Sequence, residues 1–293
     1  MALNLQTFKT RTISAVIFVA VMLSGLLINH WTFFILFSII HFGCWVEYQR
    51  LVGLIDKNYQ SITPFHRYGV MIAGWCIMLY FTTDDYTIFG LRLHEIGWWL
   101  GLIFVFVLPI MELLFTLNIQ PKIIAYSTLG LIYISLSLGL MMDLSKSIDF
   151  HFHDTLYVIS ERTIPIFIIG CLWINDTMAY ILGSLIGKNS LSKISPKKTW
   201  EGTISGIVLT IAVAGFIAWR LDFSILLLMI AAGIVAIAAI FGDLLQSKLK
   251  RMAGVKDSGA LMPGHGGFLD RFDSMLLAVP FVWLCVMIIG LLH

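Results

Sequence analysis

The chain has 293 residues, of which 59% are hydrophobic and only 12% are charged, and its mean hydropathy is +0.91. A soluble protein of this length would carry about 25% charged residues, so the composition excludes an ordinary soluble globular protein. The formal net charge of +2 says little by itself, and no nucleic acid is expected among the partners.

Nine windows approach the length of a membrane span, which takes about 20 predominantly apolar residues. In chain order they are residues 12–29, 31–47, 67–82, 96–117, 123–142, 163–186, 203–220, 223–243 and 273–292. Backbone groups in lipid must be hydrogen-bonded within their own segment, so we expect these windows to be helices. The predicted fold is an all-α polytopic integral membrane protein with about nine transmembrane helices.

The Lys and Arg residues are distributed unevenly between the connections that separate these windows. If the N-terminus is cytoplasmic, all 19 fall on the cytoplasmic side except Arg92, Lys146, Arg162 and Arg220. Such an excess is typical of the cytoplasmic face. The sequence therefore predicts a cytoplasmic N-terminus. The first window is expected to be a retained helix rather than a signal peptide, because no small-residue cleavage pattern follows it.

The polar residues that could carry chemistry are concentrated late in the chain. We expect residues 1–150 to be membrane-embedding helices and residues 151–293 to form the catalytic helices and cytoplasmic loops of one continuous membrane domain. The cysteines lie singly in separate windows, lack metal spacing and are expected to be packing residues: Cys44, Cys76, Cys171 and Cys285. His151 and His153 lie in an outer loop, where an exposed polar loop is favoured over a metal site because no third ligand is visible nearby.

Asp176 interrupts the sixth window, where a carboxylate at mid-membrane costs about 2.5–3.5 kcal/mol on insertion scales. Such a residue normally faces a polar cavity, although a structural hydrogen bond between helices is the alternative. Asp176, Tyr180, Gly183 and Gly187 share one helical face, and the two glycines would admit a neighbouring helix or a ligand. They also form a GxxxG pattern, which is weak support for a dimer interface.

The loop after this window, KNSLSKISPKKTWEG, places cations and hydroxyls behind a proline turn. A helix is predicted to begin near Thr199, so its free N–H groups would point the same way as the ammonium groups of Lys197 and Lys198. That combination suits a phosphate chain. The alternative is an ordinary positively charged cytoplasmic loop, which explains the lysines but less well the order of the other residues.

The segment from Ser247 to Asp273 lies between two apolar windows and carries cations, carboxylates and glycines. If the eighth helix continues past Gly242, Asp243, Ser247 and Lys250 fall on one face. The run Gly264-His265-Gly266-Gly267 can adopt positive φ and bring amides close to an anion. The acids fit Mg²⁺, which is held by one or two carboxylates plus substrate phosphates, better than zinc, for which Cys and His clusters are missing.

These motifs resemble those of the phosphatidate cytidylyltransferase, or CDP-diacylglycerol synthase, family. The resemblance rests on SKLKR, KDSG, PGHGG and DRFD in that order, and on the upstream blocks DTMAYILGSLIGK and SPKKTWEG. It covers roughly residues 170–280. Met262 stands where Leu, Ile or Phe is more usual in the family, which is a volume-conserving change.

The resemblance implies transfer of a cytidylyl group from CTP to phosphatidic acid, with Mg²⁺, giving CDP-diacylglycerol and pyrophosphate. It also implies membrane lipids as surroundings, a second bound cation and a homodimer. The family pattern places metal-binding carboxylates at Asp243 and Asp270. A multi-pass protein of the bacterial cell (inner) membrane is expected, with its active site facing the cytoplasm.

The candidate residues divide into two sets. The expected catalytic residues are Asp243, Asp270, Asp273, His265, Lys250 and Arg271, with Asp273 or Asp176 assisting at the metal. The residues expected to bind phosphate or nucleotide are Asp176, Ser195, Lys197, Lys198, Thr199, Ser247, Arg251, Lys256, Asp257, Gly266 and Gly267.

Two other classes of function are weighed against this one. A transporter or channel would explain an intramembrane Asp176, but it leaves the long charged, glycine-rich segment without a role. A related CTP-using membrane enzyme, either a polyprenol kinase or a cytidylyltransferase for another lipid phosphate, would keep the chemistry and change the substrate. The DGxxAR pattern of CDP-alcohol phosphotransferases is absent from the sequence.

Overall fold

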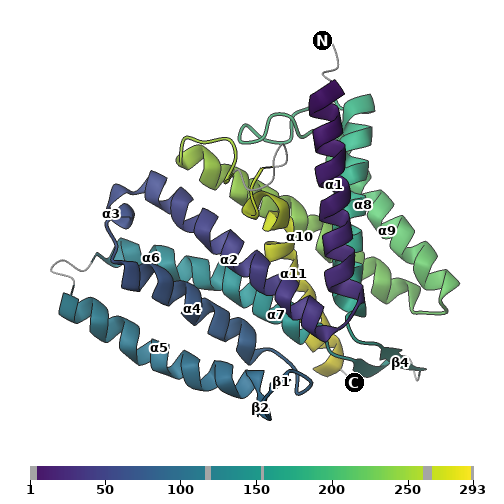
Figure 1. The fold of residues 1–293 in the computed structure, drawn as a ribbon. Helices are drawn as coiled ribbons and strands as arrows, with labels where there is room; N and C mark the ends of the chain where they lie inside the picture. Colours follow the sequence, from purple (N-terminus) through teal and green to yellow (C-terminus); the bar gives the residue numbers. More distant parts are fainter. Residues whose placement is uncertain (1–4, 116–119, 153–154, 260–265, 292–293) are drawn as a thin grey trace. The chain divides into compact units, whose positions relative to one another are not determined.

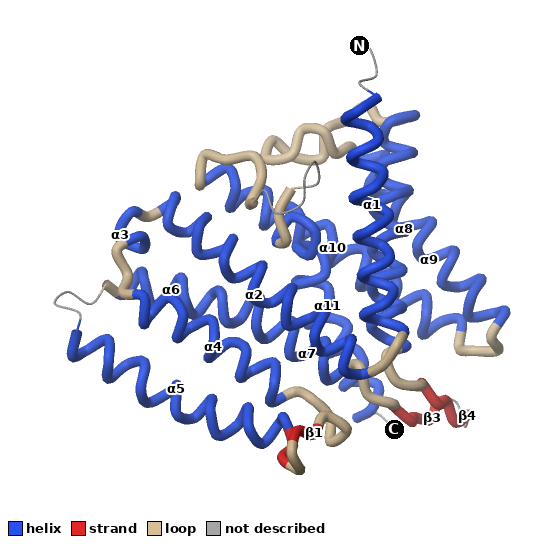
Figure 2. The backbone as a smooth tube through the Cα atoms, in the orientation of Figure 1, coloured by secondary structure: helices blue, strands red, loops and turns tan. Residues whose placement is uncertain are grey.

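The computed structural model describes residues 5–115, 120–152, 155–259 and 266–291, and these residues fold almost entirely into helices (Figures 1 and 2). The predicted site residue His265 and the substituted position Met262 lie outside the described residues. The chain packs as two compact units. Two helices are divided between the units: α10 (Ile225–Met252) near its end and α11 (Leu269–Leu291) after its first turn.

The first unit comprises Met1–Asp143 and Leu249–Phe272. Its elements, besides the last turn of α10 and the first turn of α11, are α1 (Leu5–Leu27), α2 (His30–Ile55), α3 (Lys57–Gln60), α4 (Pro64–Tyr80), β1 (Thr87–Ile88), β2 (Leu91–Arg92), α5 (Leu93–Phe115), α6 (Pro121–Gly130), the π-helix η1 (Leu131–Leu136) and α7 (Ser137–Asp143). Strands β1 and β2 form a small antiparallel hairpin before α5.

The second unit comprises Leu144–Lys248 and Asp273–His293. It contains β3 (Ile148–Phe152), β4 (Thr155–Ile159), α8 (Thr163–Ile186), α9 (Trp200–Arg220) and most of α10 and α11. The two strands pair antiparallel from Ile148 opposite Ile159 to Phe152 opposite Thr155. The predicted outer loop therefore contains a pair of antiparallel strands that we did not predict from the sequence.

Several helices begin where a side chain can satisfy their first free N–H groups. Asn29 and Thr32 form a reciprocal capping box at the start of α2. Thr63 accepts from the backbone N–H of His66, with Pro64 in the first helical position. Thr199 caps α9 by accepting from Gly202 at 3.2 Å, which confirms the predicted helix start in that loop.

The core of the first unit contains buried polar groups that are paired with one another. Ser135 in η1 contacts His41 Nε2 at 3.0 Å and accepts from Trp45 Nε1 at 2.9 Å. A β-carbon at Gly74 would overlap the Ser135 hydroxyl, so α4 approaches η1 closely only because this residue is glycine. Burying a polar side chain without a hydrogen-bond partner costs free energy, so these groups pair with one another.

Glycines also set the packing of the second unit, where α8 and α9 lie against each other (Figure 1). A β-carbon at Gly202 would lie 2.7 Å from the Gly183 Cα, and one at Gly187 would lie 2.6 Å from the Thr199 hydroxyl. The glycines of the GxxxG pattern therefore admit a helix of the same chain. The helical face of Gly183 and Gly187, which suggested a dimer interface in the sequence, is thus in contact with α9.

Among the described residues, seven helices are long and apolar enough to cross a membrane: α2, α5, α6 to α7 taken together, α8, α9, α10 and α11. The predicted all-α polytopic membrane fold is confirmed. The windows near α1 and α4 do form helices, but α1 has a shorter apolar stretch and α4 has only 17 residues. The count of nine spans and the cytoplasmic N-terminus remain predictions.

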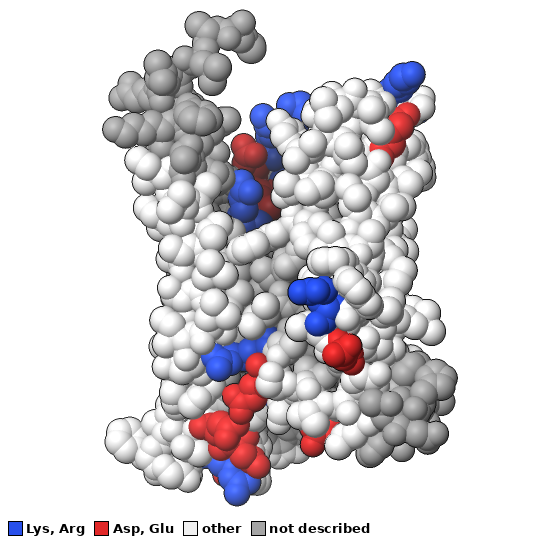
Figure 3. Space-filling model, turned by 90° about the vertical axis from the view of Figure 1, so that its right-hand side faces the viewer, with Lys and Arg blue, Asp and Glu red and all other residues white. Residues whose placement is uncertain are grey.

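The charged residues are sparse on the surface, as the composition requires. On the face drawn in Figure 3 most atoms belong to uncharged residues, and Lys, Arg, Asp and Glu gather in a few groups. Helix α5 is the most exposed of the apolar helices, with 6% of its span window buried. The four cysteines are free, and Cys44, Cys76 and Cys171 are buried as expected of packing residues.

Candidate active site

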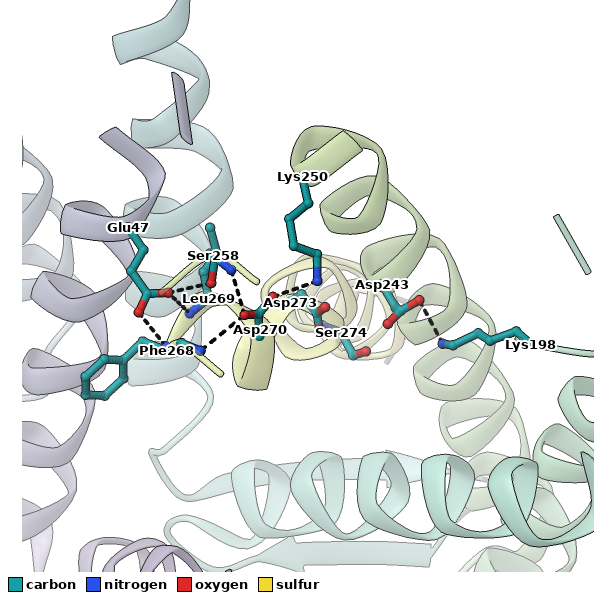
Figure 4. A network of polar contacts seen from close by, with 11 residues as sticks. Glu47, Lys198, Asp243, Lys250, Ser258, Phe268, Leu269, Asp270, Asp273 and Ser274 are labelled. Carbon is teal, nitrogen blue, oxygen red and sulfur yellow. Dashed lines mark hydrogen bonds and ion pairs between the residues drawn. The ribbon is translucent and has the colours of Figure 1, made fainter. Parts of the chain in front are cut away.

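Asp270 is the centre of a polar cluster in the first unit, at the beginning of α11 (Figure 4). Lys250 Nζ donates to its Oδ1 at 2.6 Å, and the side chains are only 15% and 11% exposed. The backbone N–H groups of Ser258 and Gly267 donate to Oδ2 at 2.8 and 3.1 Å. One ammonium group and two amides therefore stabilise the ionised carboxylate.

The same cluster contains a carboxylate that the sequence argument missed, Glu47 of α2. Glu47 is 7% exposed. Its Oε2 accepts from the Ser258 hydroxyl at 2.6 Å and from Leu269 N at 2.9 Å, and its Oε1 accepts from Phe268 N at 2.9 Å. An acid at the end of the second apolar window was a visible signal, equivalent to that of Asp176, but its partners are more than 200 residues away.

Glycines allow the segment around these acids to approach them closely. A β-carbon at Gly259 or Gly267 would overlap the carboxylate of Glu47. Gly266 has φ of 82°, a conformation that is strained for residues with a side chain. This confirms positive φ at one of the four predicted positions; the preceding glycine lies outside the described residues.

A second acid–lysine pair lies in the second unit, where Lys198 Nζ is 2.9 Å from Asp243 Oδ2. Asp243 is carried by α10, which continues to Met252 as predicted. Its side chain is 25% exposed, and no described residue makes a hydrogen bond of good geometry to the buried Oδ2 atom. The contact is therefore an ion pair, and the oxygen retains capacity for a further ligand.

Asp273 is 6% exposed on α11, one turn after Asp270. Its Oδ1 accepts from the backbone N–H of Ser274 at 2.7 Å. A β-carbon at Gly242 would lie 3.0 Å from the Ser274 Cα, so α10 and α11 are in backbone contact there, next to Asp243 in the sequence. Within the second unit, Asp273 and Asp243 are thus carried by two closely packed helices.

The predicted phosphate loop between α8 and α9 is anchored by Glu201, in the first turn of α9. Its carboxylate accepts from Lys188 N at 3.2 Å and from the Asn189 side-chain amide at 2.7 Å. Ser190 and Thr199 form an isolated antiparallel bridge. These contacts close the loop at its base, while Lys197 is exposed.

Asp176 is exposed in the structure, and Asn175 Nδ2 donates to its Oδ1 at 3.4 Å. The two residues are neighbours on α8, so this hydrogen bond does not join two helices. It also gives no sign of the polar cavity that the sequence suggested. The assisting role of Asp176 remains a prediction.

The structure assigns the other candidates to the surface or to partly buried positions. Arg251, Lys256, Asp257 and Arg271 are exposed, while Ser195, Ser247 and Gly266 are partly buried. Ser247 and Lys250 follow Asp243 at the predicted helical spacing along α10. The cluster around Asp270 therefore brings together Lys250, Gly267 and the unpredicted Glu47 and Ser258.

Each predicted metal-binding acid can be tested separately for its fit to Mg²⁺. No three His, Cys, Asp or Glu side chains within the described part of the chain are close enough to hold a metal ion. Asp243 offers a buried oxygen without a hydrogen bond, and Asp270 offers Oδ1 if Lys250 moves aside. One or two carboxylates completed by phosphates and water is the usual Mg²⁺ arrangement, so these acids fit it.

The fold and the site define an all-α polytopic membrane protein that carries two acid–lysine pairs on or beside its apolar helices. The chain belongs to the cytidylyltransferase family, whose sequence model matches residues 9–289.

Three relatives illustrate the extent of the similarity. The phosphatidate cytidylyltransferase of Haemophilus influenzae is 30% identical over 297 residues, which cover 93% of this chain and 96% of the relative. That of Synechocystis sp. is 43% identical over 131 residues, covering 43% of this chain and 44% of the relative. That of Staphylococcus haemolyticus is 46% identical over 112 residues, covering 37% and 43%. The last two matches span less than half of each relative.

Proposed function

We propose that the protein transfers a cytidylyl group from CTP to phosphatidic acid, forming CDP-diacylglycerol and pyrophosphate. The observation that carries this proposal is the similarity over 93% of the chain to a relative named for that activity. The reaction joins a phosphate oxygen of the lipid to the α-phosphorus of CTP. The bond between the α-phosphorus and the bridging oxygen breaks, and pyrophosphate leaves with the electron pair.

Both substrates are anions, so their mutual repulsion must be reduced before in-line attack. Lys198 and Lys250 are each held by a carboxylate, which keeps an ammonium group in place for a phosphate. Lys197, Arg251, Lys256 and Arg271 add positive charge for the phosphates and for the leaving pyrophosphate. The lipid phosphate is already anionic near neutral pH, so no nucleophile from the protein is required.

Asp243 and Asp270 are the residues that would hold Mg²⁺, with Asp273 as a further acid. When bound, the cation supplies charge neutralisation at the phosphate oxygens of CTP. Lys250 and Lys198 contact these acids, and their ammonium groups would bind the substrate phosphates. A second bound cation is part of the proposal but has no residues assigned to it.

The proposed setting is a bacterial inner membrane, with the diacylglycerol tails in lipid and the charged segments at the cytoplasmic surface. The sidedness of Lys and Arg supports this orientation. A homodimer is also proposed, and only the family resemblance supports it. The glycines of α8 do not, because they pack against α9 of the same chain.

The direct test is pyrophosphate release by the detergent-purified protein, given CTP, Mg²⁺ and phosphatidic acid together and with each omitted in turn. Release should require all three. Asp270→Asn should abolish it, because the amide can neither bind the cation well nor hold the Lys250 charge. The exposed Asp149 of β3 provides the matched control, and Asp149→Asn should behave as wild type.

Two outcomes would contradict the proposal. Turnover of CTP with a different lipid phosphate, but not with phosphatidic acid, would keep the chemistry and replace the substrate. A folded protein that is silent with every lipid phosphate and alcohol would favour the transporter reading of the intramembrane acids.

A further inference from the structure

We propose that Glu47 is a positioning residue for the reaction: from helix α2 it holds Ser258 and the start of α11, and through them it orients Asp270. The inference rests on the proposed function for its kinetic consequences, but its structural part stands on contacts within the first unit alone. It gives the N-terminal half of the chain a part in the chemistry besides embedding the protein in the membrane.

The contacts of Glu47 join segments far apart in the sequence. Both carboxylate oxygens are occupied: Oε1 accepts from Phe268 N, and Oε2 accepts from Leu269 N and the Ser258 hydroxyl, at distances between 2.6 and 2.9 Å. Figure 4 shows this carboxylate pointing into the turn that precedes α11. Glu47 therefore contacts both described stretches of the connection between α10 and α11, at Ser258 and at Phe268.

Three donors around a largely buried carboxylate require a charged acceptor at this point. Phe268 and Leu269 present the free N–H groups of the start of α11, where a negative charge is stabilising. The residues nearest to this helix start in sequence do not supply that charge, because the Asp270 carboxylate is taken by Lys250, Ser258 and Gly267. Glu47 caps α11 from a distant helix.

The link from Glu47 to Asp270 runs through a shared residue. Ser258 donates its hydroxyl to Glu47 and its backbone N–H to Asp270 Oδ2. Gly267 donates to the same Asp270 oxygen, and a side chain at that position would overlap the Glu47 carboxylate. Removing the Glu47 charge therefore loosens two of the three donors that orient Asp270.

A purely structural role would make a different prediction from a positioning role. Partners that hydrogen-bond a metal-binding carboxylate change metal affinity or activity by about 10- to 100-fold when they are removed. A residue needed only for stability would lower the amount of folded protein and leave the kinetic constants of the folded fraction unchanged.

The first experiment compares Glu47→Gln with Glu112→Gln, a carboxylate in the same unit that contacts His66 at 3.0 Å and lies outside this cluster. Glu47→Gln should lower kcat by about 10- to 100-fold and raise the Mg²⁺ concentration needed for half-maximal rate. Glu112→Gln should change neither quantity. Combining Glu47→Gln with Ser258→Ala should cost little more than the first change alone, because both act on one contact.

The second readout does not depend on activity. Lys256 is exposed in the anchored segment, so trypsin cleavage after it should accelerate in Glu47→Gln and remain at the wild-type rate in Glu112→Gln. If Glu47→Gln does not fold, Ser258→Ala keeps the test, because it removes the hydroxyl and retains the amide that contacts Asp270.

Unchanged Mg²⁺ dependence, kcat and cleavage rate in folded Glu47→Gln or Ser258→Ala would overturn the proposal. So would a loss of activity that only follows the amount of folded protein. If the wild type itself transfers no cytidylyl group, the proposed function fails, whereas the cleavage experiment still decides whether Glu47 anchors the segment.

Discussion

At the scale of single residues, the protein pairs each of two acids with a lysine. Asp270 is bonded to Lys250 at 2.6 Å, and Asp243 lies 2.9 Å from Lys198. The Asp270–Lys250 pair is the more buried of the two, and because burying charges carries a desolvation penalty, such a pair is weak evidence for stability. In the proposed reaction the two pairs present opposite charges to a cation and to phosphates.

Lys250→Gln should reduce kcat by about 100-fold, the usual effect of removing one group that stabilises charge in a transition state. The neutral amide cannot balance Asp270 or a leaving phosphate. Steady-state pyrophosphate release checks this. Lys248→Gln is the matched control, because Lys248 is exposed on the same helix; equal losses in the two variants would contradict a specific role for Lys250.

Lys198→Gln should weaken CTP binding more than Lys193→Gln, a change at an exposed lysine of the same loop. A hydrogen bond to a charged group contributes about 1.5–3 kcal/mol, which is about 10- to 150-fold in affinity. The dissociation constant for CTP, measured with Mg²⁺ and without lipid, checks the difference. Identical affinities would show that the Asp243 pair is not part of the nucleotide site.

At the scale of elements, the helices carrying chemistry were predictable because long apolar windows and capping residues are local signals. The start of α9 at Thr199 and the extension of α10 beyond Gly242 follow from such signals. The π-helix η1 was not predictable, because it depends on how the backbone packs and no residue pattern in that stretch marks it. The β3–β4 hairpin was missed, although residues 148–152 alternate apolar and polar side chains with the period of a strand.

The close packing of α8 and α9 leads to a prediction about stability. Gly202→Ala should destabilise the protein by about 1–3 kcal/mol, the cost of overpacking, because its β-carbon would lie 2.6 Å from the backbone oxygen of Ala179. Gly170→Ala in α8 is the control, since no atom lies within 4 Å of the added carbon. Thermal unfolding in detergent should show a lowered midpoint for the first variant only.

At the scale of the whole molecule, the orientation in the membrane is testable without any activity. We expect a cysteine introduced by Lys256→Cys to react with a membrane-impermeant reagent only from the cytoplasmic side, and one introduced by Lys146→Cys only from the opposite side. The reason is the excess of Lys and Arg on one set of connections. Labelling of both from the same side would contradict the predicted topology.

The sequence supplied the membrane fold, the order of the helices and the acids of the late segment, since each is encoded by neighbouring residues. The acid Glu47 was visible at the end of an apolar window, but its contacts were not predictable. Its hydrogen bonds connect α2 to residues 211 to 222 positions later, and sequence spacing contains no information about such a contact. The predicted division into membrane-embedding residues 1–150 and catalytic residues 151–293 stays a prediction. In the structure, Leu249–Phe272 packs with Met1–Asp143.

The central claim is tested most directly by following the α-phosphate of CTP. The purified protein is incubated with Mg²⁺, phosphatidic acid and CTP labelled at either the α- or the γ-phosphate, and lipids are extracted. We expect α-label to enter a lipid that co-migrates with CDP-diacylglycerol and γ-label to remain in water-soluble pyrophosphate. Transfer of γ-label to lipid would identify a kinase, and absence of both labels from lipid would contradict the account.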